Sequence, residues 1–246
     1  MRPLLEMTRA ALIYNIRQPA TLLFGFVMPI GIIVVFHLIG GELLGASDVA
    51  SQVVPGVLAY SVANASLSTS GMTLTAWRSS GLLSRLRLQP VSAWEVIGAR
   101  FLVSALVTLA QGAVFVALGV AFLGLRPNAL FAVVAPPAIV LGGLVFFLLG
   151  GSVGMVARSQ EAISAGINLV LLPLGLLSGC FLPLSVFPAR LSGVMELTPL
   201  TAMGQLLIGS VSGVSFSSGL LSWAVLGVSA VLAGSLFLMV YRRKTT

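Results

Sequence analysis

The residues that commonly carry out chemistry are few in this sequence and stand far apart. It holds one lysine (Lys244), one histidine (His37) and one cysteine (Cys180). A P-loop needs a lysine directly after a glycine-rich turn, so the chain cannot form a Walker A site. A disulfide framework or a multi-cysteine metal site needs more than one cysteine. We therefore predict that the chain is not an enzyme and holds no catalytic, cofactor or metal site of its own.

The composition identifies lipid as the surrounding solvent. Hydrophobic residues make up 58% of the 246 residues and charged residues only 8%, whereas a soluble domain carries about 25% charged residues. A surface with so few charges cannot face water on all sides. The net charge of +7 does not indicate a nucleic-acid partner, because the basic residues stand at the ends of apolar segments.

Apolar segments long enough to cross a membrane recur along the chain. About 20 apolar residues span the hydrocarbon core as a helix. We predict an all-α membrane protein, with residues 1–246 forming a single transmembrane domain. Its six transmembrane helices are expected at about residues 21–40, 53–75, 101–122, 130–156, 162–181 and 220–241.

The basic residues orient these spans. Of the 13 lysines and arginines, only Arg126 and Arg190 fall on the side opposite to the termini. Short cytoplasmic loops carry the excess of Lys and Arg, so both termini are expected in the cytoplasm. Residues 1–19 read as a cytoplasmic amphipathic segment that contacts membrane lipid. We expect a multi-pass protein of the plasma membrane, in a bacterial inner or cell membrane.

The predicted second span is unusually polar, although no charge interrupts it. Ser61, Asn64 and Ser68 share one helical face by their spacing. That face either lines a translocation path or forms hydrogen bonds to neighbouring helices. No acidic residue lies in the middle of a predicted span, where ionisable groups mark ion and proton pathways. The sequence therefore argues against an ion-coupled pump.

The predicted cytoplasmic loop at residues 76–100 contains a short surface helix. Leu82, Leu83 and Leu86 form one apolar strip, and Pro90 ends it. Ser92 is spaced to cap the helix that becomes the third span. The surface helix is either a functional element or a basic loop with ordinary apolar residues.

Prolines break the predicted external region at residues 182–219. Short half-helices are expected at Pro188–Leu197 and Pro199–Gly209, since proline is tolerated at the start of a helix. Backbone that is unpaired at membrane depth must be buried in protein or face water. We interpret this region as an external gate, with Phe181, Pro183, Pro188 and Pro199 as its residues.

These features resemble the permease subunits of type-2 ABC exporters over nearly the whole chain. Residues 78–100 read RSSGLLSRLRLQPVSAWEVIGAR, which is similar to the family's R-E-x-G-[ST]-L-E-x-L-x-x-x-P-[VL]-S…A-R loop. Residues 178–183 (SGCFLP), then Pro188 and residues 198–201 (TPLT), are similar to the family's external proline-containing stretch. One departure is that Ser79 and Ser84 stand where the family usually has acids.

The resemblance implies a division of labour between subunits. A separate cytoplasmic ABC ATPase would bind ATP and Mg²⁺ and dock on the 76–100 loop, and a second permease subunit would complete a homodimer or a heterodimer. The residues expected to couple to the ATPase are Arg78, Leu82, Leu83, Arg85, Leu86, Arg87, Pro90, Arg158 and Glu161.

The expected substrate follows from the few tryptophans and tyrosines in the spans. Sugar paths favour aromatic stacking surfaces, so we predict export of a hydrophobic drug or lipid-like molecule. Two alternatives remain open. One is a polysaccharide-exporting ABC permease, and the other is a stand-alone secondary transporter or membrane assembly subunit.

Overall fold

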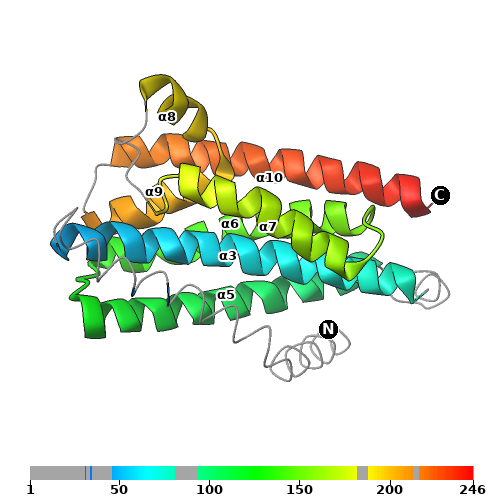
Figure 1. The fold of residues 1–246 in the computed structure, drawn as a ribbon, viewed down its shortest axis with the longest axis horizontal. Coiled ribbons are helices and arrows are strands. Elements are labelled where there is room, and N and C mark those ends of the chain that lie inside the picture. Colours follow the sequence, from blue (N-terminus) through cyan, green and yellow to red (C-terminus); the bar gives the residue numbers. More distant parts are fainter. Residues whose placement is uncertain are drawn as a thin grey trace.

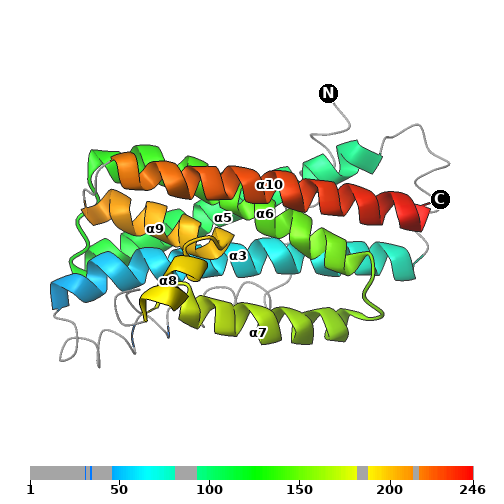
Figure 2. The same ribbon diagram turned by 90° about the horizontal axis from the view of Figure 1, so that it is seen from above.

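The computed structural model describes residues 31, 34, 46–80, 93–181, 188–212 and 216–245. This part of the chain is built of helices joined by turns, as the all-α prediction expected. Figures 1 and 2 show long helices running side by side in one bundle. The helices are α3 (Ala46–Ser79), α5 (Ala93–Leu123), α6 (Ala129–Gly154), α7 (Gln160–Leu177), α8 (Ala189–Met195), α9 (Pro199–Ser212) and α10 (Phe216–Thr245).

Four of the predicted spans are confirmed as helices of sufficient length and apolar character to cross a membrane. They are Glu95–Leu123, Ala129–Gly154, Gln160–Leu177 and Gly219–Arg243. The predicted second span is the 34-residue α3, which is as long as the bundle but more polar than these four. The first span lies outside the described residues except for Gly31 and Val34, which are both helical. The six-span topology and the cytoplasmic termini therefore stay predictions.

Helix α6 lies at the centre and packs against α3, α5, α9 and α10. Two glycines let its backbone approach α3 closely, because a Cβ on Gly150 would lie 2.2 Å from the Leu67 carbonyl oxygen. A Cβ on Gly154 would lie 2.5 Å from the Gly71 carbonyl oxygen. Small residues four apart commonly permit such approach between membrane helices. The second half of α3 and the second half of α6 are therefore packed backbone to backbone.

The predicted external region holds two short helices, α8 and α9. Helix α9 is not a surface element, since it packs against α3, α6 and α10. Its apolar residues are buried in the main hydrophobic core, and Met203 fills the space that Gly142 of α6 leaves open. The structure therefore places part of this region inside the bundle.

Candidate functional site

The connections that carry the predicted coupling residues meet at one end of the bundle. Figure 1 places the end of α3, the turn between α6 and α7 and the C-terminal end of α10 at that end. The predicted surface helix follows α3 directly. Its residues lie outside the described part of the chain, so their coupling role stays a prediction; they are Leu82, Leu83, Arg85, Leu86, Arg87 and Pro90.

Two side chains of α3 bind the C-terminal end of α6. The Thr75 hydroxyl donates a hydrogen bond to the Gly154 carbonyl oxygen at 3.0 Å. The Arg78 guanidinium donates to the carbonyl oxygens of Met155 and Ala157. The last carbonyls of a helix have no partner within it and carry partial negative charge, so a cation is well suited to this position. The last turn of α3 is thus fastened to the α6–α7 turn.

This role of Arg78 adds to the one expected from the sequence. The loop pattern indicated a contact with an ATPase, whereas the structure shows the guanidinium bound to carbonyls 77 and 79 residues further along the chain. The sequence does indicate that Thr75 and Arg78 act together, because they are three residues apart and therefore share one face of α3. Nothing in the sequence identifies the distant helix end as their partner.

The α6–α7 turn presents the two other predicted coupling residues. Arg158 and Glu161 are both exposed. Between them, the Ser159 side chain caps α7 by accepting a hydrogen bond from the Ala162 N–H at 3.2 Å. A capped helix start holds the turn in one conformation. Arg158 and Glu161 are therefore displayed at a fixed position close to the end of α3.

The three predicted path residues have different surroundings. Ser61 is buried, and its hydroxyl donates to the Val57 carbonyl oxygen of its own helix at 2.8 Å. Asn64 and Ser68 are only half-buried. The Ser68 hydroxyl donates to the Asn64 side-chain oxygen at 3.4 Å. The polar face is therefore divided between a satisfied core hydroxyl and a more accessible pair, Asn64 and Ser68.

The predicted gate residue Phe181 is buried against the opposite half of α3. Its ring and that of Tyr60 are tilted, with centroids 5.1 Å apart. The Gln52 amide donates to the Gly179 carbonyl oxygen at 3.2 Å, and a Cβ on Gly56 would lie 1.8 Å from the Cys180 carbonyl oxygen. The segment after α7 is therefore closely packed against α3.

The prolines of the predicted gate are spread over the neighbouring segment. Pro188 is exposed and precedes α8, while Pro199 is the first residue of α9. Thr198 caps α9, since its hydroxyl accepts a hydrogen bond from the Thr201 N–H at 3.3 Å. Pro183 lies outside the described residues. Of the predicted gate residues, Phe181 contacts Tyr60 through its ring.

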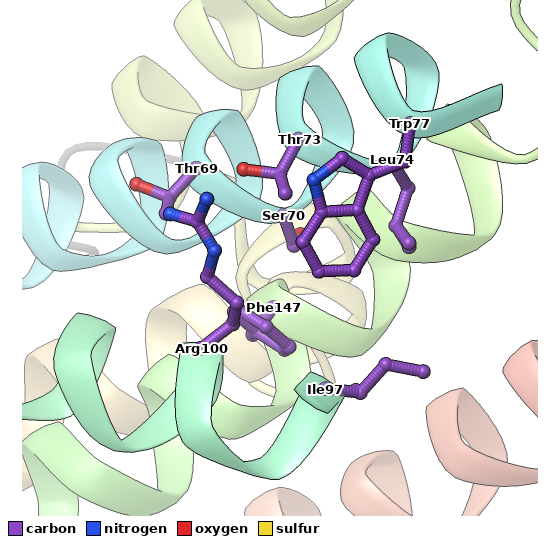
Figure 3. A pocket seen from close by; sticks show the side chains of 8 residues that line it. All are labelled: Thr69, Ser70, Thr73, Leu74, Trp77, Ile97, Arg100 and Phe147. Carbon is purple, nitrogen blue, oxygen red and sulfur yellow. The ribbon is translucent and has the colours of Figure 1, made fainter. Parts of the chain in front are cut away.

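A shallow crevice opens between α3, α5 and α6 near the same end as the Arg78 link. It is lined by Thr69, Ser70, Thr73, Leu74, Trp77, Ile97, Arg100 and Phe147 (Figure 3). The Arg100 guanidinium lies over the Trp77 ring, with its carbon atom 5.5 Å from the ring centroid. The sequence pattern had indicated Arg100 only as part of the basic loop, because it gives no sign that α3 and α5 adjoin there.

Comparison with known proteins assigns the architecture to a family. The model of the ABC-2 type transporter family matches residues 4–212. No curated protein matches the sequence significantly. The family match includes the loop around Arg78, the α6–α7 turn and the segment from Phe181 to α9. The chain therefore belongs to the ABC-2 type transporter family and is a membrane-spanning permease component of an ABC transporter.

Proposed function

We propose that this chain is the membrane-spanning subunit of an ATP-driven exporter of a hydrophobic drug or lipid-like molecule. A separate cytoplasmic ABC ATPase binds ATP and Mg²⁺ and docks on the 76–100 loop. Two permease subunits, identical or different, complete the path. The observation that carries this proposal is the link from Arg78 to the α6–α7 turn, in a chain of the ABC-2 family.

The link from Arg78 to the α6–α7 turn transmits movement of the ATPase into the helix bundle. In this proposal, a push on the predicted surface helix of the 76–100 loop is transmitted to the last turn of α3. Because Thr75 and Arg78 bind the end of α6, and because Gly150 and Gly154 keep the two backbones in contact, α6 and the start of α7 move with α3. Packed interfaces of this kind switch between discrete arrangements rather than deforming continuously.

The path runs along the half-buried side of α3 that carries Asn64 and Ser68. Its outer end is closed by the packing of Phe181 on Tyr60. Asn64 and Ser68 stand among the half-buried apolar residues Ala65, Leu67 and Met72 of α3. A few polar groups among apolar side chains orient a largely hydrophobic molecule, as in other small-molecule sites. This is the reason for preferring a drug or lipid-like substrate over a polysaccharide.

The proposal is tested by changing the docking surface alone. Leu86→Asp places a charge in the apolar strip of the surface helix, and we expect it to abolish ATP-dependent efflux while insertion stays normal. The matched control is Leu197→Asp, because Leu197 is 64% exposed and lies in the predicted external region. Efflux of a fluorescent hydrophobic drug from cells, normalised to inserted protein, is the measurement. Unchanged efflux from well-inserted Leu86→Asp would contradict the proposed docking site.

A further inference from the structure

An amide side chain is exposed in the middle of α7, which is a candidate membrane span. Asn168 lies eight residues after Gln160, where α7 begins, and nine residues before Leu177, where it ends. Its amide nitrogen donates a hydrogen bond to the Ser164 carbonyl oxygen at 3.0 Å, and that bond does not involve the side-chain oxygen. Polar groups in an apolar medium cost free energy unless they are hydrogen-bonded. Asn168 is therefore poorly suited to face lipid.

Helix α7 packs along α3 and runs in the opposite direction. A Cβ on Gly71 of α3 would lie 3.3 Å from the Ile163 side chain, near the start of α7. A Cβ on Gly175, near the end of α7, would lie 2.6 Å from the Tyr60 ring of α3. Figures 1 and 2 show the two helices side by side over this stretch. These two contacts fix which residues of α3 and α7 lie at the same depth.

Asn168 lies at the depth of the two accessible path residues on α3. Measured along α7 from the contact at Ile163, Asn168 is about 7.5 Å away at 1.5 Å per residue. Measured along α3 in the same direction from Gly71, Ser68 is about 4.5 Å away and Asn64 about 10.5 Å away. The amide of Asn168 is therefore level with the space between Asn64 and Ser68.

The three polar residues also share one side of the helix pair. On α3, Asn64 and Ser68 follow Tyr60 at intervals of four residues, and each interval turns about 40° further around the helix. On α7, Asn168 follows the buried Ile167 by one residue, a turn of about 100°. Because both helices are right-handed and run in opposite directions, these turns lead to the same side of the pair. Asn168 is exposed and Asn64 and Ser68 are half-buried, so this side is accessible.

We propose that Asn168 forms a second polar wall of the transport path, beside Asn64 and Ser68, and that the two amides bind an uncharged carbonyl or hydroxyl group of the substrate. This inference rests on the proposed exporter function and specifies the substrate class further. An amide presents donors and an acceptor but no charge, so the pair matches a neutral polar group better than an organic cation. The exposed Leu172, one turn further along α7, offers apolar contact to the rest of the molecule.

The reactivity of introduced cysteines tests this wall without transport. In a Cys180→Ala background, Asn168→Cys and Leu169→Cys of the full chain would each be treated in membrane vesicles with a small water-soluble maleimide. A thiol reacts as its thiolate, which forms in water and not in lipid. Leu169 is 77% exposed but lies two residues after Ile167, about 200° around α7 and therefore away from α3. We expect Asn168→Cys to react about tenfold faster than Leu169→Cys.

Efflux of the fluorescent hydrophobic drug tests the contact with the substrate. Asn168→Leu has a similar shape but lacks the amide, and it should raise the drug concentration for half-maximal efflux by about tenfold, the effect of one hydrogen bond. Combined with Asn64→Ala, it should have less effect than the product of the two single changes, because both amides bind one group. Leu169→Ala is the matched control and should leave the half-maximal concentration unchanged.

Two results would overturn the inference. One is equally slow labelling of Asn168→Cys and Leu169→Cys, which would place the amide against lipid or another helix. The other is an unchanged half-maximal concentration in well-inserted Asn168→Leu. If Asn168→Cys fails to insert, Ser164→Cys replaces it, since Ser164 is half-buried one turn earlier on α7. Labelling needs neither ATP nor a partner, so slow labelling contradicts this inference alone, whereas rapid labelling in a chain that exports no drug contradicts the exporter function.

Discussion

Replacing Arg78 with methionine removes the guanidinium that binds the α6–α7 turn and keeps a side chain of similar length. The carbonyl oxygens of Met155 and Ala157 then lose their charged donor, while the Thr75 bond to Gly154 remains. A hydrogen bond to a charged group contributes about 1.5–3 kcal/mol. Arg78 is only half-buried, so water replaces part of this interaction. We therefore expect a loss of about 2 kcal/mol in the local stability of the turn.

Amide hydrogen exchange measures that loss without any knowledge of the substrate. Met155 and Ala157 follow the end of α6, and their N–H groups donate to the carbonyl oxygens of Gly151 and Val153 in its last turn. Their exchange depends on local opening, and about 2 kcal/mol corresponds to an acceleration of about 30-fold. Arg126→Met is the control, because Arg126 is exposed in the α5–α6 connection.

The link from Arg78 to the α6–α7 turn also has a functional consequence. In the complete complex, Arg78→Met should leave ATP hydrolysis largely intact and reduce export, because α6 no longer follows α3. Exchange at Met155 and Ala157 that stays at the wild-type rate in a well-inserted Arg78→Met protein would refute the structural argument. Normal export despite faster exchange would refute the coupling role alone.

Three further substitutions test other parts of the account. Gly154→Ala should destabilise the bundle by about 1–3 kcal/mol, because its Cβ would lie 2.5 Å from the Gly71 carbonyl oxygen. The midpoint temperature of thermal unfolding should decrease clearly, whereas Gly166→Ala, whose Cβ meets open space, should leave it almost unchanged. Phe181→Ala should make Cys180, which is fully buried, reactive to a maleimide added from outside, and continued protection would argue against Phe181 as the outer barrier. Asn64→Ala should reduce efflux severalfold by removing the accessible amide, while Ser61→Ala, which loses only a bond to its own helix, should transport normally; equal effects would contradict the proposed path.

The sequence predicted those features of the fold that depend on local composition. Four apolar segments are long helices because about 20 apolar residues have no stable alternative in lipid. The ends of the helices were less predictable. Helix α3 runs from Ala46 to Ser79, beyond the predicted 53–75, because hydropathy detects only the membrane-spanning part of a helix and not the polar residues that continue it at either end. Helix α5 begins at Ala93, directly after the predicted cap, Ser92.

The sequence did not predict which residues of distant segments contact one another. The pairing of Arg78 with the end of α6 and that of Phe181 with Tyr60 each join residues far apart in the chain. Such pairs depend on how the helices pack, and that packing cannot be inferred from a single sequence. The predicted path face shows the same limit, since spacing placed Ser61 with Asn64 and Ser68 but could not reveal that Ser61 is enclosed by neighbouring helices.

Identification of the partner tests the central claim most directly. The tagged chain would be purified from its native membrane in mild detergent, and the proteins that accompany it identified and quantified by mass spectrometry. We expect a stoichiometric cytoplasmic ABC ATPase that is lost from a Leu83→Asp/Leu86→Asp variant and retained by Leu197→Asp. Repeated purification of intact, inserted protein with no ATPase would contradict it and favour a stand-alone transporter or an assembly subunit.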